Sequence, residues 1–270
     1  MLLAEKQYGS GVAMMIRRTK QEVFKDLKRK VRVALPFEID NMAKYQDAKK
    51  EFDYWLSTAK GKGSFGQIET LKQLAVEGKF KAAVEWIKDM LESEDKLVIF
   101  AEHKNTIDKL MQVFKGIAVR VDGGTSYKKR EEAKDKFQRC KRCGVRKEKH
   151  AHIKYSCKSY IPDLSTRLYI GSSAAKEGTT LTASEHVVFM EFWWSPKDHD
   201  QAEDRCYGRA GDLHGATAWY LVASGTIEED IAKTLDIKNI ALEKVMDGRD
   251  LSKDQMITEL LKRYRQKGDL

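Results

Sequence analysis

Two arginines four residues apart are the side chains in this sequence best suited to chemistry. On a helix Arg205 and Arg209 point to one face, and Gln201 lies one turn earlier on that face. A guanidinium presents forked donors that match phosphate oxygens, so the pair is suited to a triphosphate or a nucleic-acid backbone. The alternative is a solvated helix face on which the arginines pair with Glu203 and Asp204. The spacing alone leaves both interpretations open.

A C-x2-C pair, two histidines and a further cysteine gather in residues 139–165. Thiolate and imidazole are the ligands of tetrahedral zinc, and in a reducing cell this spacing favours a metal over a disulfide. We therefore expect a structural zinc site in a small insertion; the competing interpretation is an unstructured basic segment with free thiols. The favoured ligands are Cys140, Cys143, His150 and Cys157, and the alternative register takes His152 in place of His150.

Positive charge is both abundant and clustered. The 270 residues include 50 Lys and Arg against 41 Asp and Glu, which gives a net charge of +9. Basic residues concentrate at residues 17–32 and 139–158. Clustered Lys and Arg favour a phosphate backbone because each contact releases condensed counterions, so a nucleic-acid partner is expected. The alternative is a soluble protein with a lysine-rich surface.

Hydrophobic residues make up 41% of the chain, which is enough for a buried core. No apolar run reaches the roughly 18 residues of a membrane-spanning helix, and the first residues lack a secretory signal. We expect an intracellular protein without a membrane partner, in the cytoplasm or nucleoid, or in the nucleus of a eukaryote.

After Gly78, short apolar runs alternate with segments of helical spacing. Gly78 itself is expected to interrupt regular secondary structure just before a helix begins. Such alternation predicts an α/β fold, a parallel sheet with helices on both faces and ligands at the carboxyl ends of the strands. The expected strands are residues 97–101, 117–121, 167–170, 186–190 and 216–222. The expected domains are a mostly helical N-terminal extension (1–77), the α/β lobe (78–248, containing the insertion 139–165) and a helical tail (249–270).

The order of these segments resembles the carboxyl-terminal, RecA-like lobe of Swi/Snf-type superfamily-two helicases, with the annealing-helicase branch most similar. The resemblance covers nearly all of residues 14–248. The family's motif VI usually separates its two arginines by three positions, whereas here Gly208 intervenes. The stretches that carry the resemblance are residues 16–23 (entry into the lobe), 96–104 (motif IV), 121–126 with Arg130, 171–181 (motif V), 191–196, 201–205 (motif VI) and 224–229.

The resemblance implies the second motor lobe of an ATP-driven translocase that acts on duplex DNA. In such a lobe Arg205 and Arg209, with Gln201 beside them, reach a nucleotide, and Arg209 is the favoured finger to the γ-phosphate. Glu177, Gly178 and Thr179 would also contact the nucleotide. The implied contacts with the DNA backbone are His103, Lys104, Thr125, Arg130 and Lys176.

The sequence has no G-x-x-x-x-G-K-[ST] phosphate loop and no Asp-Glu-x-His magnesium segment. Phosphoryl transfer needs that cradle and its metal, because an arginine finger only stabilises transition-state charge. We therefore expect negligible ATP hydrolysis by this chain alone, and ATP with Mg²⁺ shared with a separate first lobe. The chain is expected to be a monomer. The alternatives are a non-catalytic nucleic-acid-binding module and the lobe of an RNA helicase.

Overall fold

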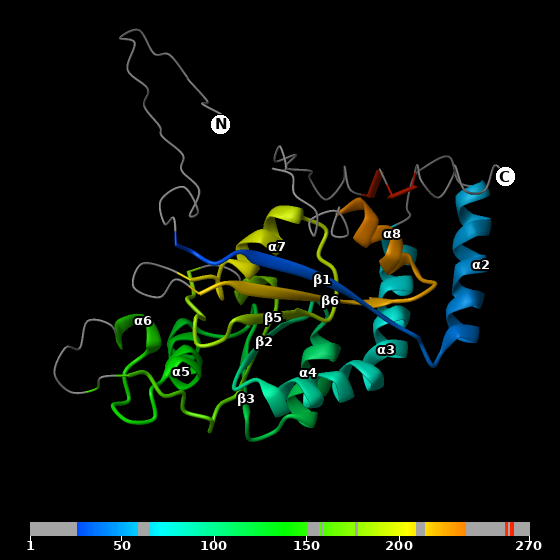
Figure 1. Ribbon diagram of the computed structural model, residues 1–270. Helices are drawn as coiled ribbons and strands as arrows, with labels where there is room; N and C mark the ends of the chain where they lie inside the picture. The colour runs from blue at the N-terminus through cyan, green and yellow to red at the C-terminus, as the bar shows by residue number, and fades with distance from the viewer. Residues whose placement is uncertain are drawn as a thin grey trace, which may run out of the picture.

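The computed structural model describes residues 26–58, 65–150, 157, 159–175, 178–208, 214–235, 257–258 and 260–261. Six parallel strands form one sheet in the order β1-β6-β5-β2-β4-β3 (Figure 1). The strands are β1 (Lys30–Phe37), β2 (Leu97–Phe100), β3 (Ala118–Val121), β4 (Leu168–Gly171), β5 (His186–Phe189) and β6 (Ala216–Ala223). The helices are α2 (Met42–Thr58), α3 (Phe65–Ser93), α4 (Lys104–Val113), α5 (Tyr127–Gln138), α6 (Lys147–His150), α7 (Pro196–Glu203) and α8 (Ile227–Thr234), with a 3-10 turn η1 (Ser173–Ala175).

The core forms two layers because successive residues of a strand face opposite sides of the sheet. Val98 and Phe100 belong to a cluster with α5, α7, α8 and the first half of α3. Leu97 and Ile99 belong to a second cluster with α4 and the second half of α3. The predicted α/β class, with helices on both faces of a parallel sheet, is confirmed, and the five predicted strands correspond to β2 to β6.

The sixth strand, β1, is the main departure from the predicted elements. It lies at one edge of the sheet and pairs in parallel with β6, with Lys30 opposite Ala216. No strand was expected among residues 1–77, because Lys30 and Arg32 interrupt the apolar character of this stretch. The structure balances both charges with carboxylates of α7 and the turn after it. The domain boundaries themselves stay predictions.

Gly78 does not end a helix, contrary to the prediction, since α3 continues through it from Phe65 to Ser93. Its role is to allow a close approach: a Cβ at this position would lie 2.6 Å from the Cβ of Ile39. The amide of Asp40 also donates to the carbonyl of Gly78 at 3.1 Å. The missing side chain therefore lets the connection from β1 to α2 rest directly on α3. Within the described part of the chain, no helix is both long and apolar enough to cross a bilayer.

Candidate functional site

Arg205 lies where α7 has ended, in the turn that leads towards β6. Its Nε donates to the carbonyl of Gln201 at 3.0 Å, and its Nη1 to the carbonyl of Thr179 at 3.5 Å. Its own carbonyl accepts from the amide of Leu181 at 2.8 Å. The segment that resembles motif V and the segment that resembles motif VI are therefore in direct contact.

This arginine segment lies at the amino-terminal edge of the sheet. The Sγ of Cys206 lies 3.9 Å from the carbonyl of His186, the first residue of β5. The amide of Gly208 donates to the carbonyl of His214, just before β6, at 3.2 Å. The segment follows α7 and precedes β6, so it lies away from the carboxyl ends of the strands, where ligands were expected. In Figure 1, β1 and β6 run from the side of α5 and α6 towards the side of α2, so the arginine segment and the insertion share one edge.

The helix expected to carry both arginines ends before them. α7 ends at Glu203, and residues 204–206 form a turn. Arg209 lies outside the described residues, as do Lys176, Glu177 and His152. Gly178 has φ +65°, a left-handed conformation that favours glycine at this position of the loop.

Glu203 anchors the end of α7. Its carboxylate is fully buried and accepts from Arg32 Nη2 at 2.8 Å and Tyr220 Oη at 2.6 Å, with Lys30 Nζ 2.8 Å away. Burial alone raises the pKa of this carboxyl, but the charges of Lys30 and Arg32 outweigh it and hold the pKa at about 2. From the sequence alone, Glu203 was expected only as a possible partner of the arginines beside it. The available signal was the alternation of Lys30 and Arg32, which places both charges on one face of a strand.

The segment after β2 belongs to the opposite edge of the sheet. Nδ1 of His103 lies 2.5 Å from Glu191 Oε2, and Nε2 lies 3.4 Å from Glu69 Oε2. Hydrogen bonds to these two carboxylates raise the pKa of His103 to about 10, so the ring is an imidazolium at neutral pH. Its side chain is only 19% exposed, whereas Lys104 next to it is exposed. Lys104 is therefore the better placed of the two for a phosphate of the DNA backbone.

Thr125 and Arg130 stabilise the loops after β3 and β4. Thr125 Oγ1 donates to Asp122 Oδ1 at 2.9 Å and accepts from the amide of Asp122 at 2.9 Å. The guanidinium of Arg130 donates to the carbonyls of Thr125 (2.8 Å), Ala174 (3.0 Å) and Asp122 (2.9 Å). This geometry favours Arg130 as a brace between the two loops over a direct phosphate contact.

The two adjacent tryptophans after β5 are both buried. Trp193 is 3% and Trp194 is 5% exposed. Trp194 Nε1 donates to Glu69 Oε1 at 3.0 Å, and Lys72 Nζ lies 4.7 Å from the centroid of the Trp194 ring. Both rings therefore belong to the core, and Trp194 also contacts the charged side chains of Glu69 and Lys72.

The four favoured metal ligands come together. The ligand atoms of Cys140, Cys143, His150 and Cys157 all lie within 4.8 Å of one another. The backbone forms a tight turn after the second cysteine: Gly144, with φ +73°, donates its amide to the carbonyl of Cys140 at 2.9 Å. Within the insertion, isolated antiparallel bridges pair Arg139 with Arg146 and Cys140 with Pro162.

The donor set fits a tetrahedral zinc ion. Zinc–sulfur bonds of about 2.3 Å place two thiolates about 3.8 Å apart, and the Sγ atoms of Cys140 and Cys157 are 3.9 Å apart. Burial raises the pKa of the Cys140 thiol, but backbone amides, that of Ile161 first, outweigh it and lower the pKa to about 6. Nε2 of His150 is buried and lacks a hydrogen-bond partner among the described residues. A buried imidazole nitrogen without a partner and a thiol that favours its thiolate are what a metal would satisfy.

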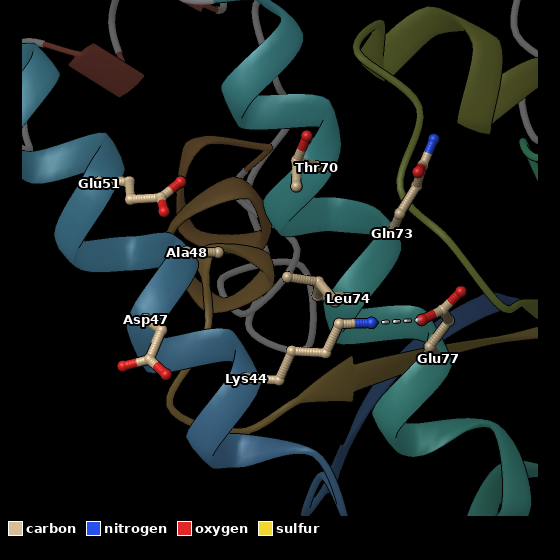
Figure 2. Close-up of a pocket in the computed structure, with 8 residues that line it drawn as sticks. All are labelled: Lys44, Asp47, Ala48, Glu51, Thr70, Gln73, Leu74 and Glu77. Atoms are coloured by element: carbon tan, nitrogen blue, oxygen red, sulfur yellow. Dashed lines mark ion pairs between the residues drawn. The ribbon is translucent and has the colours of Figure 1, made fainter.

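A cavity of about 410 Å³ lies between α2 and α3 (Figure 2). Its lining includes neither the Arg205 segment nor the four candidate metal ligands. Lys44 and Glu77 face each other across it at 3.8 Å. Carboxylates outnumber cations in its lining, so it does not suit the phosphates of a nucleotide. The lining residues are Lys44, Asp47, Ala48, Glu51, Thr70, Gln73, Leu74 and Glu77.

Two curated proteins are similar to this chain over most of its length. One is the SWI/SNF-related matrix-associated actin-dependent regulator of chromatin subfamily A-like protein 1 of Drosophila melanogaster, which is 30% identical over 237 residues. The aligned stretch covers 86% of this chain and 28% of that protein. The other is the DNA annealing helicase and endonuclease ZRANB3 of Homo sapiens, which is 30% identical over 249 residues. This aligned stretch covers 87% of this chain and 21% of that protein. The chain thus spans less than a third of either relative. No protein-family model matches it.

Solved structures share the fold. The C-terminal part of the Fun30 ATPase domain matches with a TM-score of 0.58 at 15% identity, over 89% of this chain and 99% of that one. The Sulfolobus solfataricus SWI2/SNF2 ATPase core in complex with dsDNA matches with a TM-score of 0.59 at 21% identity, over 87% and 49%. At these identities the likeness concerns the fold alone.

Proposed function

Because this chain is a homologue of the SWI/SNF-related annealing helicases and has the fold of a SWI2/SNF2 ATPase C-terminal domain, we propose that it is the second motor lobe of an ATP-dependent DNA translocase. Its task in that protein is to complete a nucleotide site and to grip duplex DNA. One observation carries the proposal: Arg205 is tied to Thr179 and Leu181, so the two segments that would meet the nucleotide form one unit.

The nucleotide belongs between this lobe and a first lobe that supplies the phosphate loop and the Mg²⁺ ligands. Mg²⁺ with ATP supplies the phosphoryl chemistry, and Arg205 and Arg209 stabilise the charge that develops during transfer. Gln201 accepts from Arg205 through its backbone carbonyl, and so helps to fix that side chain. Thr179 contacts Arg205 through its carbonyl, and Glu177 and Gly178 come directly before it in the sequence.

DNA is assigned to the loops at the carboxyl ends of β2, β3 and β4. Lys104 is exposed there, and the half-buried Thr125 sits in a turn tied to Asp122. Arg130 and His103 hold neighbouring loops in place through the contacts described above, and Lys176 follows η1 in sequence. Closure of the cleft between this lobe and the first lobe would then move this set of contacts along the DNA backbone.

The insertion is assigned a structural zinc ion held by Cys140, Cys143, His150 and Cys157. Its support is the donor geometry, together with the small size of the insertion, which has little core of its own to fold around. Zinc here supplies folding energy to the insertion and is not a ligand of the nucleotide.

The test compares arginine variants in a protein that joins this lobe to a first lobe. Arg205→Ala and Arg209→Ala should each lower DNA-stimulated ATP hydrolysis by about a hundredfold or more, as expected for removing a donor to transition-state charge. Lys88→Ala, which removes an exposed cation of α3 outside the assigned contacts, is the control and should retain the rate.

A normal DNA-stimulated rate in both arginine variants would remove the motor assignment and leave a non-catalytic binding module. Rapid ATP turnover by the isolated chain with DNA and Mg²⁺ would contradict the need for a first lobe.

A further inference from the structure

The cysteine insertion contacts the chain that leads into β5 directly through Lys147, and indirectly through Gln138 of α5. Lys147 Nζ, at the start of α6, donates to the carbonyl of Thr182 at 2.7 Å. Gln138 Oε1, at the end of α5, accepts from the amide of Ala183 at 2.6 Å, and its Nε2 donates to Glu148 of α6 at 2.8 Å. The first contact therefore depends directly on where α6 lies, and the second is linked to α6 through Glu148.

The residues held in this way continue directly to the arginine segment. Thr182 follows Leu181, whose amide donates to the carbonyl of Arg205. On the other side, Ser184 Oγ donates to the carbonyl of Lys96 at 2.7 Å, which fixes the segment to the beginning of β2. Residues 179–184 thus bridge the insertion and Arg205 without a break in the chain.

The position of α6 depends in turn on the metal ligands. α6 has only four residues, and a helix of this length has little stability of its own. Its last residue is His150, one of the four candidate ligands. Coordination of His150 to a metal shared with the three cysteines would therefore fix the helix that carries Lys147 and Glu148.

We propose that the metal cluster is a positioning device for Arg205: the metal fixes α6, and Lys147 and Gln138 hold residues 179–183 against the arginine. Lys147 and Gln138 are positioning residues, since they act through this segment. The inference rests on the proposed zinc site and on the proposed role of Arg205, and it adds that the metal state of the insertion controls the order of the nucleotide-facing segment.

Amide hydrogen exchange of the purified chain tests this without the first lobe. Removing zinc with a chelator should speed exchange at Leu181 and Ala183, and re-adding zinc should restore it. In the zinc-loaded chain, Lys147→Met should speed exchange at Leu181 by about threefold to tenfold, the factor worth one ordinary hydrogen bond. Lys147→Arg keeps a donor and should restore protection. If Lys147 stabilised only its immediate surroundings, Lys147→Met would not change the exchange rate of the Leu181 amide, because that amide donates to the carbonyl of Arg205.

Lys149→Met is the matched control, since it removes the same charge from an exposed position of α6. Slow exchange at Ile99 and Val188 in the core shows that each variant is folded. Exchange at Leu181 that stays unchanged after metal loss, or that responds equally to Lys147→Met and Lys149→Met, overturns the inference. So does a chain that binds no zinc. None of these results touches the motor proposal, which the arginine variants test separately.

Discussion

Replacing Glu203 by glutamine removes the negative charge on which Lys30, Arg32 and Tyr220 converge, and we expect a large loss of stability. The pKa of this buried carboxyl is held at about 2, against an ordinary value of 4.5. This gap corresponds to about 3 kcal/mol, because each pKa unit is worth about 1.4 kcal/mol. The loss of one partner from a buried ion pair independently predicts about 3–5 kcal/mol.

The pH dependence follows from the sign of this change. A carboxyl whose pKa is lowered in the folded state contributes stability that is fully present above its unfolded pKa. For Glu203 that stability is lost as the pH falls from about 4.5 through about 2. Glu203→Gln should therefore unfold more easily at pH 7 and lose this part of the acid sensitivity of the wild-type chain.

Urea denaturation followed by tryptophan fluorescence, repeated between neutral and acid pH, measures both effects. Glu185→Gln is the matched control, because Glu185 is exposed and should change the free energy of unfolding by no more than about 0.5 kcal/mol. If Glu203→Gln were as stable as Glu185→Gln at pH 7, the anchoring of α7 by β1 would be refuted.

Gly78→Ala should lower the free energy of unfolding by about 1–3 kcal/mol, because the added methyl group meets Ile39, and thermal denaturation measures the loss. Gly66→Ala in the same helix, with open space around it, should be neutral or stabilising. The ring of His103 should stay protonated through pH 8 and lose its proton only near pH 10, as followed by NMR; ordinary titration near pH 6.5 would contradict the two carboxylate contacts. The purified chain should contain one zinc ion per molecule by metal analysis, and Cys143→Ser should lose it.

The cluster of four candidate metal ligands and most of the sheet could be predicted because their signals are local. A strand buried on both faces is a continuous apolar run, as in Leu97–Phe100, and needs no knowledge of its neighbours. The C-x2-C spacing and the glycine after it likewise describe a turn within a few residues of Cys143.

Partners distant in the sequence were decided only by the tertiary structure. Arg32 and Glu203 are 171 positions apart, and nothing near either residue indicates that one neutralises the other and so allows a charged strand at the edge of the sheet. Arg205 meets Thr179 only because the segment before β5 passes beside the end of α7. The sequence by itself determined which residues are apolar, which can ligate a metal and which carry charge. The fold decided which of them meet, because a charge or a hydrogen-bonding group is satisfied by whatever the packing of the sheet and helices brings within reach.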